Sequence, residues 1–153
     1  MEERFSRTAM LLGLDAVEEL QKSHVAIVGL GGVGSYAAEA IARAGVGELT
    51  LVDCDMVSVT NINRQLCALT STVGLPKAEV TARRVADINP NAVVHSLALF
   101  YEPETREMFF STRFDYIIDA IDTVSAKTDL ICTAIARGIP IVSALGTGNK
   151  LYP

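Results

Sequence analysis

The chain has 153 residues, half of them hydrophobic, and a formal net charge of −5. This length suits one compact domain, residues 1–153, and is short for two. The acidic balance excludes a bulk basic surface for gripping nucleic acid, although a local patch could still hold RNA. No apolar run approaches the roughly 20 residues of a membrane-spanning helix, and the charged start is unlike a signal peptide, so no membrane partner is expected.

Short apolar runs alternate with helical patterns along the chain. The start ERFSRTAMLLG predicts one short helix, with Ser6 as its candidate cap. Nearly continuous Val, Ile and Leu runs, typical of strands covered on both faces, predict strands at His24–Leu30, Glu48–Asp53, Val93–Leu99, Tyr116–Asp119 and Ile139–Ala144. Helices are expected at Gly34–Ala44, Lys77–Ile88, Pro103–Phe110 and Ser125–Arg137. The alternation predicts an α/β fold with a doubly wound, mainly parallel, Rossmann-like sheet, in which ligands bind beyond the carboxyl ends of the strands.

A glycine-rich stretch, GLGGVGS, follows the first predicted strand and opens a helix. Gly29 and Gly31 allow a tight turn and close backbone approach, and Gly34 lets the helix pack on the strand. The free N–H groups of the helix start then attract phosphate. Asp53 ends the next strand, where a carboxylate can hold ribose hydroxyls. The stretch therefore predicts a nucleotide site, for either NAD or ATP.

Cations near the loop decide between these nucleotides. ATP carries about four negative charges and is handled with Mg²⁺ and Arg or Lys, whereas the diphosphate of NAD needs no metal. Arg64 lies in a polar segment that must cross the ligand edge of the sheet, and Lys77 begins the next helix. Asp122 lies just past the fourth strand, where it is placed to hold Mg²⁺. Asp119 is the alternative ligand, and Asp122 could instead cap the following helix.

Five motifs in order, GLGGVGS, DCD, NINRQ, PKAE and DAIDT, resemble those of the ThiF-type adenylate-forming superfamily. That superfamily includes ubiquitin-activating enzymes and the bacterial sulfur-carrier adenylyltransferases. The resemblance covers nearly the whole chain. Within the superfamily, RFSRTAMLLG, VTNINRQ, STVGLPKAEV and DAIDTVSAK are most similar to the tRNA threonylcarbamoyladenosine dehydratase branch, whereas the sulfur-carrier branch tends to read NLQRQ and DCTDN at the matching places.

The resemblance implies an ATP site and names its residues. The candidates for nucleotide binding are Gly29, Gly31, Gly32, Gly34, Asp53, Asp55, Thr60, Asn61, Asn63, Arg64 and Lys77. Arg64 and Lys77 would neutralise the phosphates, and Asp122 would hold Mg²⁺. The resemblance also implies a homodimer, in which Arg7 of one subunit reaches the phosphates of the other, with Arg4 as a competitor. The catalytic candidates are therefore Arg64, Lys77, Asp122 and Arg7.

The implied reaction is the activation of a carboxylate by ATP. The carboxylate attacks the α-phosphate, releases pyrophosphate and leaves an acyl-adenylate. In the dehydratases this carboxylate belongs to the threonylcarbamoyl side chain of a modified adenosine in tRNA, and ring closure follows with net loss of water. The alternative is a sulfur-carrier adenylyltransferase that acts on a carboxyl-terminal Gly-Gly, with a carrier or sulfur-transfer protein as partner. An NAD-binding oxidoreductase is a third reading, but it leaves the cations and Asp122 unexplained.

The three cysteines form no CxxC pair, which favours neither a disulfide framework nor a thiolate zinc site, and a reducing cytoplasm is expected. Cys54 and Cys132 are expected in the core, whereas Cys67 could lie near the site. His24 and His95 are interpreted as structural residues of strands.

The chain ends in a glycine-rich segment, SALGTGNKLYP. Glycine-rich turns after a strand normally lead into further structure, so we expect this chain to be the N-terminal part of a longer protein. The dehydratases are longer and carry, beyond the matching region, a cysteine with a proposed catalytic role. That role is not transferred to any cysteine of this chain.

Overall fold

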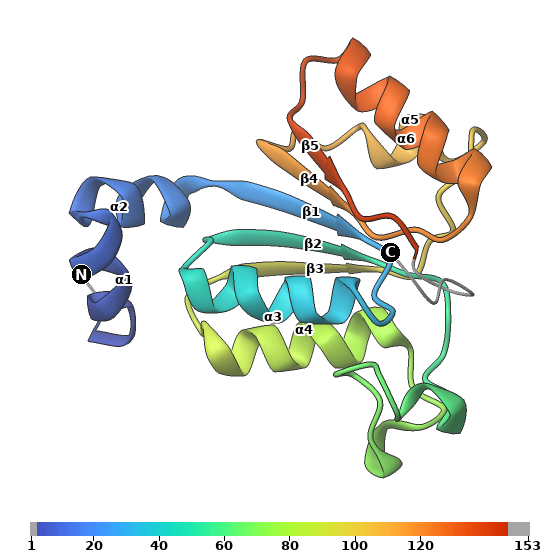
Figure 1. The fold of residues 1–153 in the computed structure, drawn as a ribbon, viewed down its shortest axis with the longest axis horizontal. Coiled ribbons are helices and arrows are strands. Elements are labelled where there is room, and N and C mark those ends of the chain that lie inside the picture. The colour runs from blue at the N-terminus through green and yellow to red at the C-terminus, as the bar shows by residue number, and fades with distance from the viewer. Residues whose placement is uncertain (1–2, 147–153) are drawn as a thin grey trace.

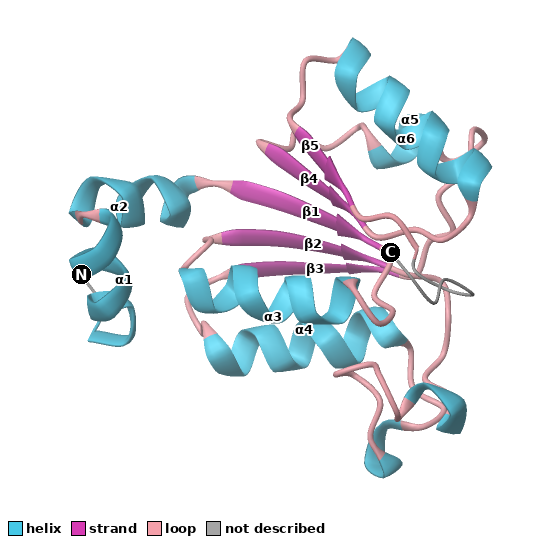
Figure 2. Ribbon diagram, in the orientation of Figure 1, coloured by secondary structure: helices cyan, strands magenta, loops and turns pink. Residues whose placement is uncertain are grey.

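The computed structural model describes residues 3–146 and shows one five-stranded sheet with helices on both faces (Figures 1 and 2). The strands are β1 (His24–Val28), β2 (Glu48–Val52), β3 (Val93–Leu97), β4 (Tyr116–Asp119) and β5 (Ile141–Ser143). Their order is β3-β2-β1-β4-β5, and all neighbours pair in parallel. The predicted doubly wound α/β fold is confirmed. Residues 147–153, which hold the end of the glycine-rich segment, lie outside the described residues.

The helical elements include two 3₁₀ turns that interrupt the path from β2 to α4. The elements are η1 (Glu3–Phe5), α1 (Ser6–Leu12), α2 (Leu14–Lys22), α3 (Gly34–Ala44), η2 (Val59–Asn61), η3 (Thr70–Thr72), α4 (Lys77–Ile88), α5 (Arg106–Phe109) and α6 (Val124–Ala136). None of the described helices is long and apolar enough to cross a membrane. The predicted bounds of α3 and α4 are confirmed, and α6 begins and ends one residue earlier than predicted.

The predicted short amino-terminal helix is confirmed as α1, whereas the second helix, α2, was not predicted. Two α-helices, α1 and α2, meet at Gly13, whose φ of +92° breaks the helical path. Ser6 is the first residue of α1 and forms no capping hydrogen bond, because Phe5 holds the cap position. Phe5 and Val17 bury their side chains in a small cluster with Ala9, which ties the two helices together.

Four of the five strands end earlier than the apolar runs suggest. At β1 the chain leaves the sheet at Gly29, whose φ of +91° turns the backbone away from the strand direction. Asp53, Leu99 and Ala144, predicted as strand residues, follow their strands as loop residues. Only β4 has the predicted bounds. Gly29, Asp53, Leu99 and Ala144 form part of the wall of the site described below.

Two core layers account for the continuous apolar strands. Successive strand side chains point to opposite faces, so each strand contributes to both layers. On one face, Ala38 and Ala42 of α3 and Ala78 and Val85 of α4 pack against strands β1 and β2. On the other face, α6 packs with Phe109, Phe110 and Phe114 against β1 and β4 (Figure 1). The small alanines let the helices approach the sheet closely, which holds the strand ends rigidly.

The strand order reverses between β1 and β4. In sheets of this kind the chains leaving the two central strands turn to opposite faces and open a crevice where ligands bind. The glycine loop follows β1, and the loop that holds Asp122 follows β4. Both therefore border the crevice.

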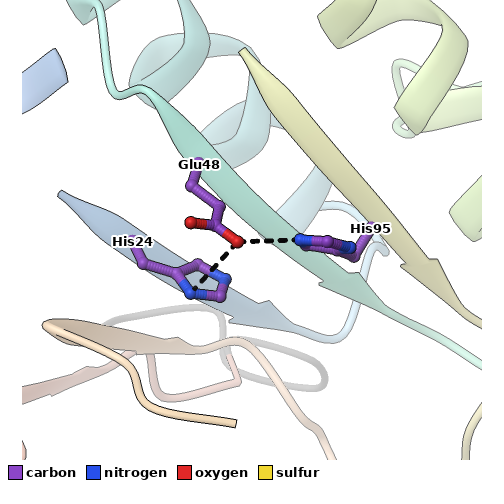
Figure 3. Close-up of side chains that lie close together, drawn as sticks. All are labelled: His24, Glu48 and His95. Atoms are coloured by element: carbon purple, nitrogen blue, oxygen red, sulfur yellow. Dashed lines mark hydrogen bonds and ion pairs between the residues drawn. The ribbon is translucent and has the colours of Figure 1, made fainter. Parts of the chain in front are cut away.

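The amino-terminal ends of the strands gather a different set of polar side chains. The register pairs His24 of β1 with Glu48 of β2, and Thr50 of β2 with His95 of β3. His24, Glu48 and His95 consequently lie together on one face of the sheet (Figure 3). The edge strand β3 is largely exposed there.

Candidate active site

A cavity of about 780 Å³ lies at the carboxyl ends of the strands. Loops that follow all five strands contribute to its wall. Among the predicted site residues, the wall contains Gly29, Gly31, Gly32, Asp53, Asp55, Asn61, Arg64, Lys77 and Asp122. Gly34, Thr60, Asn63 and Arg7 are not part of it.

The glycine loop can form only with small residues at two positions. A Cβ at Gly29 would lie 2.7 Å from the backbone oxygen of Ala120, which joins β4 to its loop. A Cβ at Gly34 would lie 1.6 Å from the backbone oxygen of Gly29. Gly34 therefore holds the start of α3 against the loop rather than facing the cavity, which leaves the loop backbone open to a ligand.

Substituting Gly34 with alanine is expected to lower the free energy of unfolding by at least about 3 kcal/mol, because backbone must move to admit the methyl group. The matched control is Gly32→Ala. A Cβ at Gly32 would meet only atoms of Arg64, the nearest at 3.6 Å, which is ordinary contact, so the change in the free energy of unfolding should stay within about 1 kcal/mol. Urea unfolding of both variants measures the difference, and equal midpoints would contradict the packing role of Gly34.

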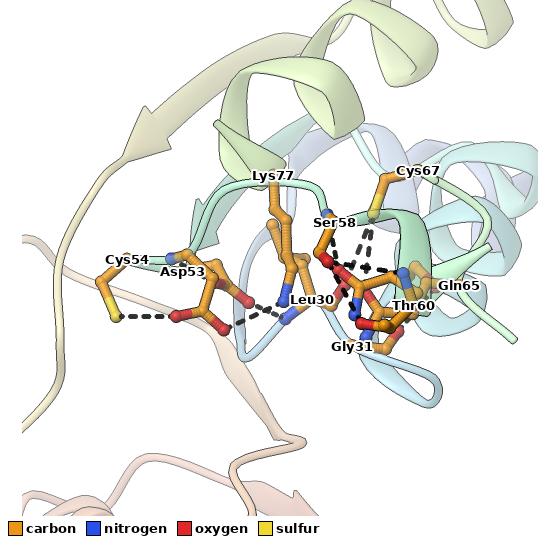
Figure 4. Close-up of polar contacts among 12 residues, drawn as sticks. Leu30, Gly31, Asp53, Cys54, Ser58, Thr60, Gln65, Cys67 and Lys77 are labelled. Atoms are coloured by element: carbon orange, nitrogen blue, oxygen red, sulfur yellow. Dashed lines mark hydrogen bonds and ion pairs between the residues drawn. The ribbon is translucent and has the colours of Figure 1, made fainter. Parts of the chain in front are cut away.

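Asp53 connects the glycine loop to the segment after β2. Its Oδ2 accepts a hydrogen bond from the backbone N–H of Leu30 at 2.7 Å, and its Oδ1 accepts one from the N–H of Asp55 at 2.8 Å. Figure 4 shows the carboxylate between these two segments. Two backbone donors fix its orientation on the cavity wall, so it offers a positioned acceptor to a hydroxyl group of a ligand.

Lys77 is a buried cation on the same wall. It begins α4 with only 5% of its surface exposed, and its Nζ donates to Asp55 Oδ2 at 3.0 Å (Figure 4). Its backbone N–H also donates to the backbone oxygen of Asp55. An ammonium group has three donors, and a buried charge needs partners. Lys77 can therefore bind a further anion in the cavity without leaving its ion pair.

Arg64 reaches the cavity from the polar segment and lies over Gly32. Its Nη1 donates to the backbone oxygen of Thr60 at 3.0 Å and to Asn63 Oδ1 at 2.9 Å. Thr60 and Asn63 therefore contact Arg64 and do not line the cavity, and their oxygens orient its guanidinium. Asn61 lies on the wall, and its Oδ1 accepts from the N–H of Ser58, which caps the turn η2.

The two aspartates of DAID have different environments. Asp119 is fully buried, and its Oδ2 accepts from Lys127 Nζ and from Ser143 Oγ, both at 2.6 Å. It is absent from the described cavity wall, so the alternative metal ligand is disfavoured. Asp122 is exposed on the wall. It does not cap α6, because Thr123 holds the cap position without a side-chain hydrogen bond.

The amino-terminal arginines lie far from the cavity of their own chain. Helices α1 and α2 lie beyond the amino-terminal ends of the strands, whereas the cavity lies at the carboxyl ends (Figure 1). Arg7 of α1 is exposed. Arg4 Nη1 donates to the backbone oxygen of Ile88 at 2.7 Å, which fixes it to α4 of its own chain.

Several wall residues were not predicted from the sequence. They follow β3, β4 and β5 and are largely apolar: Leu99, Phe100, Tyr101, Ala120, Ile121, Thr123, Ala144, Leu145 and Gly146. The available signal was their position directly after predicted strands, since those ends meet at the ligand edge. They give the cavity an apolar part of its wall, which suits a planar base.

Tyr101 anchors one of these walls. Its hydroxyl donates to Asp129 Oδ2 at 2.9 Å, and burial raises the pKa of Tyr101, so the phenol stays neutral. Arg106 binds the same carboxylate, and this hydrogen bonding lowers the pKa of Asp129. The charged pair therefore holds Tyr101 in place from behind the wall.

The cysteines offer no activated nucleophile in the described part of the chain. Desolvation raises the pKa of both Cys54 and Cys67, which favours the thiol over the thiolate. The prediction that Cys54 and Cys132 are core residues is wrong, since both are exposed. Cys54 lies past the end of β2, and Cys132 lies on an outer face of α6. Cys67 is buried near the backbone oxygen of Leu30.

Known proteins similar to this chain are adenylating enzymes and tRNA-modifying enzymes. The tRNA threonylcarbamoyladenosine dehydratase of Bacillus subtilis is 50% identical over 150 residues, which are 98% of this chain and 59% of that protein. The Escherichia coli protein of the same name is 45% identical over 99% of this chain and 56% of its own length. Molybdopterin-synthase adenylyltransferase of E. coli is 37% identical over 92% of this chain and 57% of its own length. The chain therefore spans less than two thirds of each of these relatives.

The fold agrees with a solved structure from the same group. The crystal structure of the E. coli tRNA N6-threonylcarbamoyladenosine dehydratase, TcdA, in complex with ATP matches with a TM-score of 0.95 and 45% identity, over 99% of this chain and 62% of that one. The model of the ThiF family matches residues 5–150, nearly the whole chain. The chain belongs to the ThiF family.

Proposed function

We propose that the cavity binds ATP. The observation that carries this proposal is the convergence of Arg64, Lys77 and Asp122 on the glycine loop. Two cations and a metal-ligating carboxylate match the charge of a triphosphate with Mg²⁺, and exceed what a dinucleotide needs. The TcdA structure that resembles this chain is a complex with ATP, which supports the same nucleotide.

Each wall has a role in this proposal. The backbone of the glycine loop and the start of α3 receive phosphate oxygens, and Asp53 accepts from the ribose hydroxyls. Arg64 and Lys77 neutralise phosphate charge from two sides, with Asn63 and Thr60 orienting Arg64. Asp122 would hold Mg²⁺, which would supply further charge neutralisation.

The chemistry we propose is adenylation of a carboxylate. A carboxylate oxygen of the substrate attacks the α-phosphorus, the bond from that phosphorus to the bridging oxygen breaks, and pyrophosphate leaves. The protein performs no covalent step, because catalysis of this kind depends on positioning and on stabilising the phosphate charge. This agrees with the protonated state favoured for Cys54 and Cys67.

The substrate that the names of the relatives support best is the threonylcarbamoyl side chain of a modified adenosine in tRNA. The relatives that are 50% and 45% identical carry the name of that dehydratase, compared with 37% for the molybdopterin-synthase adenylyltransferase. In this proposal the adenylate is attacked within the same side chain, AMP leaves, and the net result is loss of water. We also propose a cytoplasmic location, which agrees with a tRNA substrate.

We further propose a homodimer in which Arg7 serves the partner's cavity. Helix α1 lies at the end of the sheet remote from its own cavity (Figure 1), so Arg7 needs a second copy to act on phosphate. Arg4 is bonded to its own α4 and is the weaker candidate.

The second candidate is adenylation of a protein's carboxyl-terminal Gly-Gly. It rests on the similarity to the molybdopterin-synthase adenylyltransferase, which covers 92% of this chain. The same cavity would serve, and the partner would be a small carrier protein rather than tRNA.

Pyrophosphate release separates the candidates. The purified protein with Mg²⁺ and ATP is supplied with tRNA carrying threonylcarbamoyladenosine, with the same tRNA lacking that group, or with a carrier protein ending in Gly-Gly. Release that depends on the threonylcarbamoyl group is expected. Release that depends on the carrier would establish the second candidate. Tight binding of NADH without binding of Mg²⁺ and ATP would refute the ATP proposal itself.

A further inference from the structure

Three side chains of types that can ligate metals lie close together at the end of the sheet remote from the cavity. His24 begins β1, Glu48 begins β2, and His95 lies in β3. One ligand atom of each lies within 4.8 Å of the other two (Figure 3). We propose that these residues bind a divalent transition-metal ion, with Zn²⁺ as the best match. This site is independent of the proposed ATP chemistry.

The register of the sheet builds this cluster. His24 pairs with Glu48 across β1 and β2, and Thr50 pairs with His95 across β2 and β3. Residues two apart on a strand share a face, so Glu48 and Thr50 point to the same side, as do their partners. Three different strands therefore supply the ligands, and the hydrogen-bonded sheet holds their backbones in place without a metal.

His24 is already oriented as a metal-bound imidazole would be. Its Nε2 lies 2.8 Å from Thr50 Oγ1, and the ring of Phe114 packs edge-on with centroids 5.0 Å apart. In the tautomer that donates its Nε2 proton to Thr50, Nδ1 presents a lone pair toward Glu48. Outer contacts of this kind commonly fix ligating histidines.

The distances suit a small ion between the ligands. His24 Nδ1 lies 3.6 Å from Glu48 Oε1, too far for a hydrogen bond, and His95 Nε2 lies 2.8 Å from the same oxygen. Two ligands of a tetrahedral Zn²⁺, each about 2.0–2.1 Å from the ion, are separated by roughly 3.3 Å. To reach this separation from Glu48, His95 must move outward by about half an ångström, which its 46% exposed side chain permits, and His24 must approach by about 0.3 Å.

The ligand types select the ion. Two imidazoles and one carboxylate suit Zn²⁺ and its neighbours, whereas Mg²⁺ and Ca²⁺ prefer oxygen alone. The partial exposure of Glu48 and His95 leaves the fourth position open to water. Asp115, whose carboxylate accepts from the backbone N–H of His24, adds negative charge beside the site. The ion would join β1, β2 and β3 near the end of the sheet that is remote from the cavity.

Cobalt titration tests the proposal, because Co²⁺ reports its ligands in the visible spectrum. The purified chain, without a tag, nucleotide or Mg²⁺, is expected to bind one Co²⁺ with d–d bands and no thiolate charge-transfer band, and Zn²⁺ should displace it. His95→Ala should weaken binding at least about 100-fold, and Thr50→Val, which removes the contact to His24, by about 10–100-fold. His95 is exposed, so its variant should fold, and circular dichroism checks this.

A second cluster makes the test selective. Residues 53–55 also place ligand atoms within 4.8 Å of one another, in the cavity. Glu48→Gln, which removes a proposed ligand, should weaken Co²⁺ binding. Its matched control, Glu79→Gln, removes an exposed carboxylate of α4 and should leave the affinity unchanged, as should Cys54→Ser. Three results would overturn the proposal: no Co²⁺ binding, full affinity in His95→Ala, or a thiolate band that disappears in Cys54→Ser.

Discussion

Replacing Asp122 with alanine is expected to abolish adenylate formation while the fold survives. Asp122 is exposed on the cavity wall and does not cap α6, so its loss should change the free energy of unfolding by no more than about 0.5 kcal/mol. In the proposed site it is the residue that would hold Mg²⁺ against the phosphates. Pyrophosphate release measures the first expectation, and urea unfolding measures the second.

Two other aspartates make this prediction specific. Asp15→Ala removes an exposed carboxylate of α2, far from the cavity, and should leave activity and stability unchanged. Asp119→Ala, unlike Asp122→Ala, should destabilise the fold. It leaves the buried Lys127 ammonium without its carboxylate partner, which typically lowers the free energy of unfolding by about 3–5 kcal/mol. Full activity of Asp122→Ala would refute the metal assignment, and equal instability of Asp122→Ala and Asp119→Ala would show that Asp122 has a structural role.

Local signals explain why much of the fold could be predicted. Gly34 begins α3, and Gly45 ends it with a φ of +104°, so a single glycine marks each boundary of this helix. Lys77 follows Pro76, whose restricted φ fits the entry to α4. The glycine loop, Asp53 and Lys77 belong to short motifs beside such boundaries, and the structure brings them to one cavity.

Features that depend on distant segments could not be predicted. The helical pattern of α6 does not say which side faces solvent, so exposed Cys132 was expected in the core. Lys127 is buried only because Asp119 of β4 and the backbone oxygen of Ala144 after β5 meet it there. The contact between His24, Glu48 and His95 depends on strand register across segments separated by more than twenty residues in sequence, which no local pattern reports.

The Lys77 ammonium is expected to stabilise the phosphate charge of a nucleotide in the cavity. Lys77→Met keeps the length of the side chain and removes its charge, and it should slow adenylation about 100- to 1,000-fold, the usual cost of losing one positioned donor to developing charge. The fold should survive, because the partner carboxylate of Asp55 is 64% exposed and can be solvated. Lys22→Met is the control, since Lys22 pairs with Glu19 on the exposed side of α2.

Asp55→Asn separates the two roles that Lys77 could have. This variant weakens the 3.0 Å ion pair but leaves the ammonium in the cavity wall, where the backbone bond from Lys77 to residue 55 still holds the start of α4. If Lys77 acts on phosphate, Asp55→Asn should retain most of the activity that Lys77→Met loses. Equal losses in the two variants would mean that the ion pair shapes the wall and that the ammonium does not contact phosphate. Arginine at position 77 should not restore activity, because a planar guanidinium cannot occupy a buried site shaped for an ammonium group.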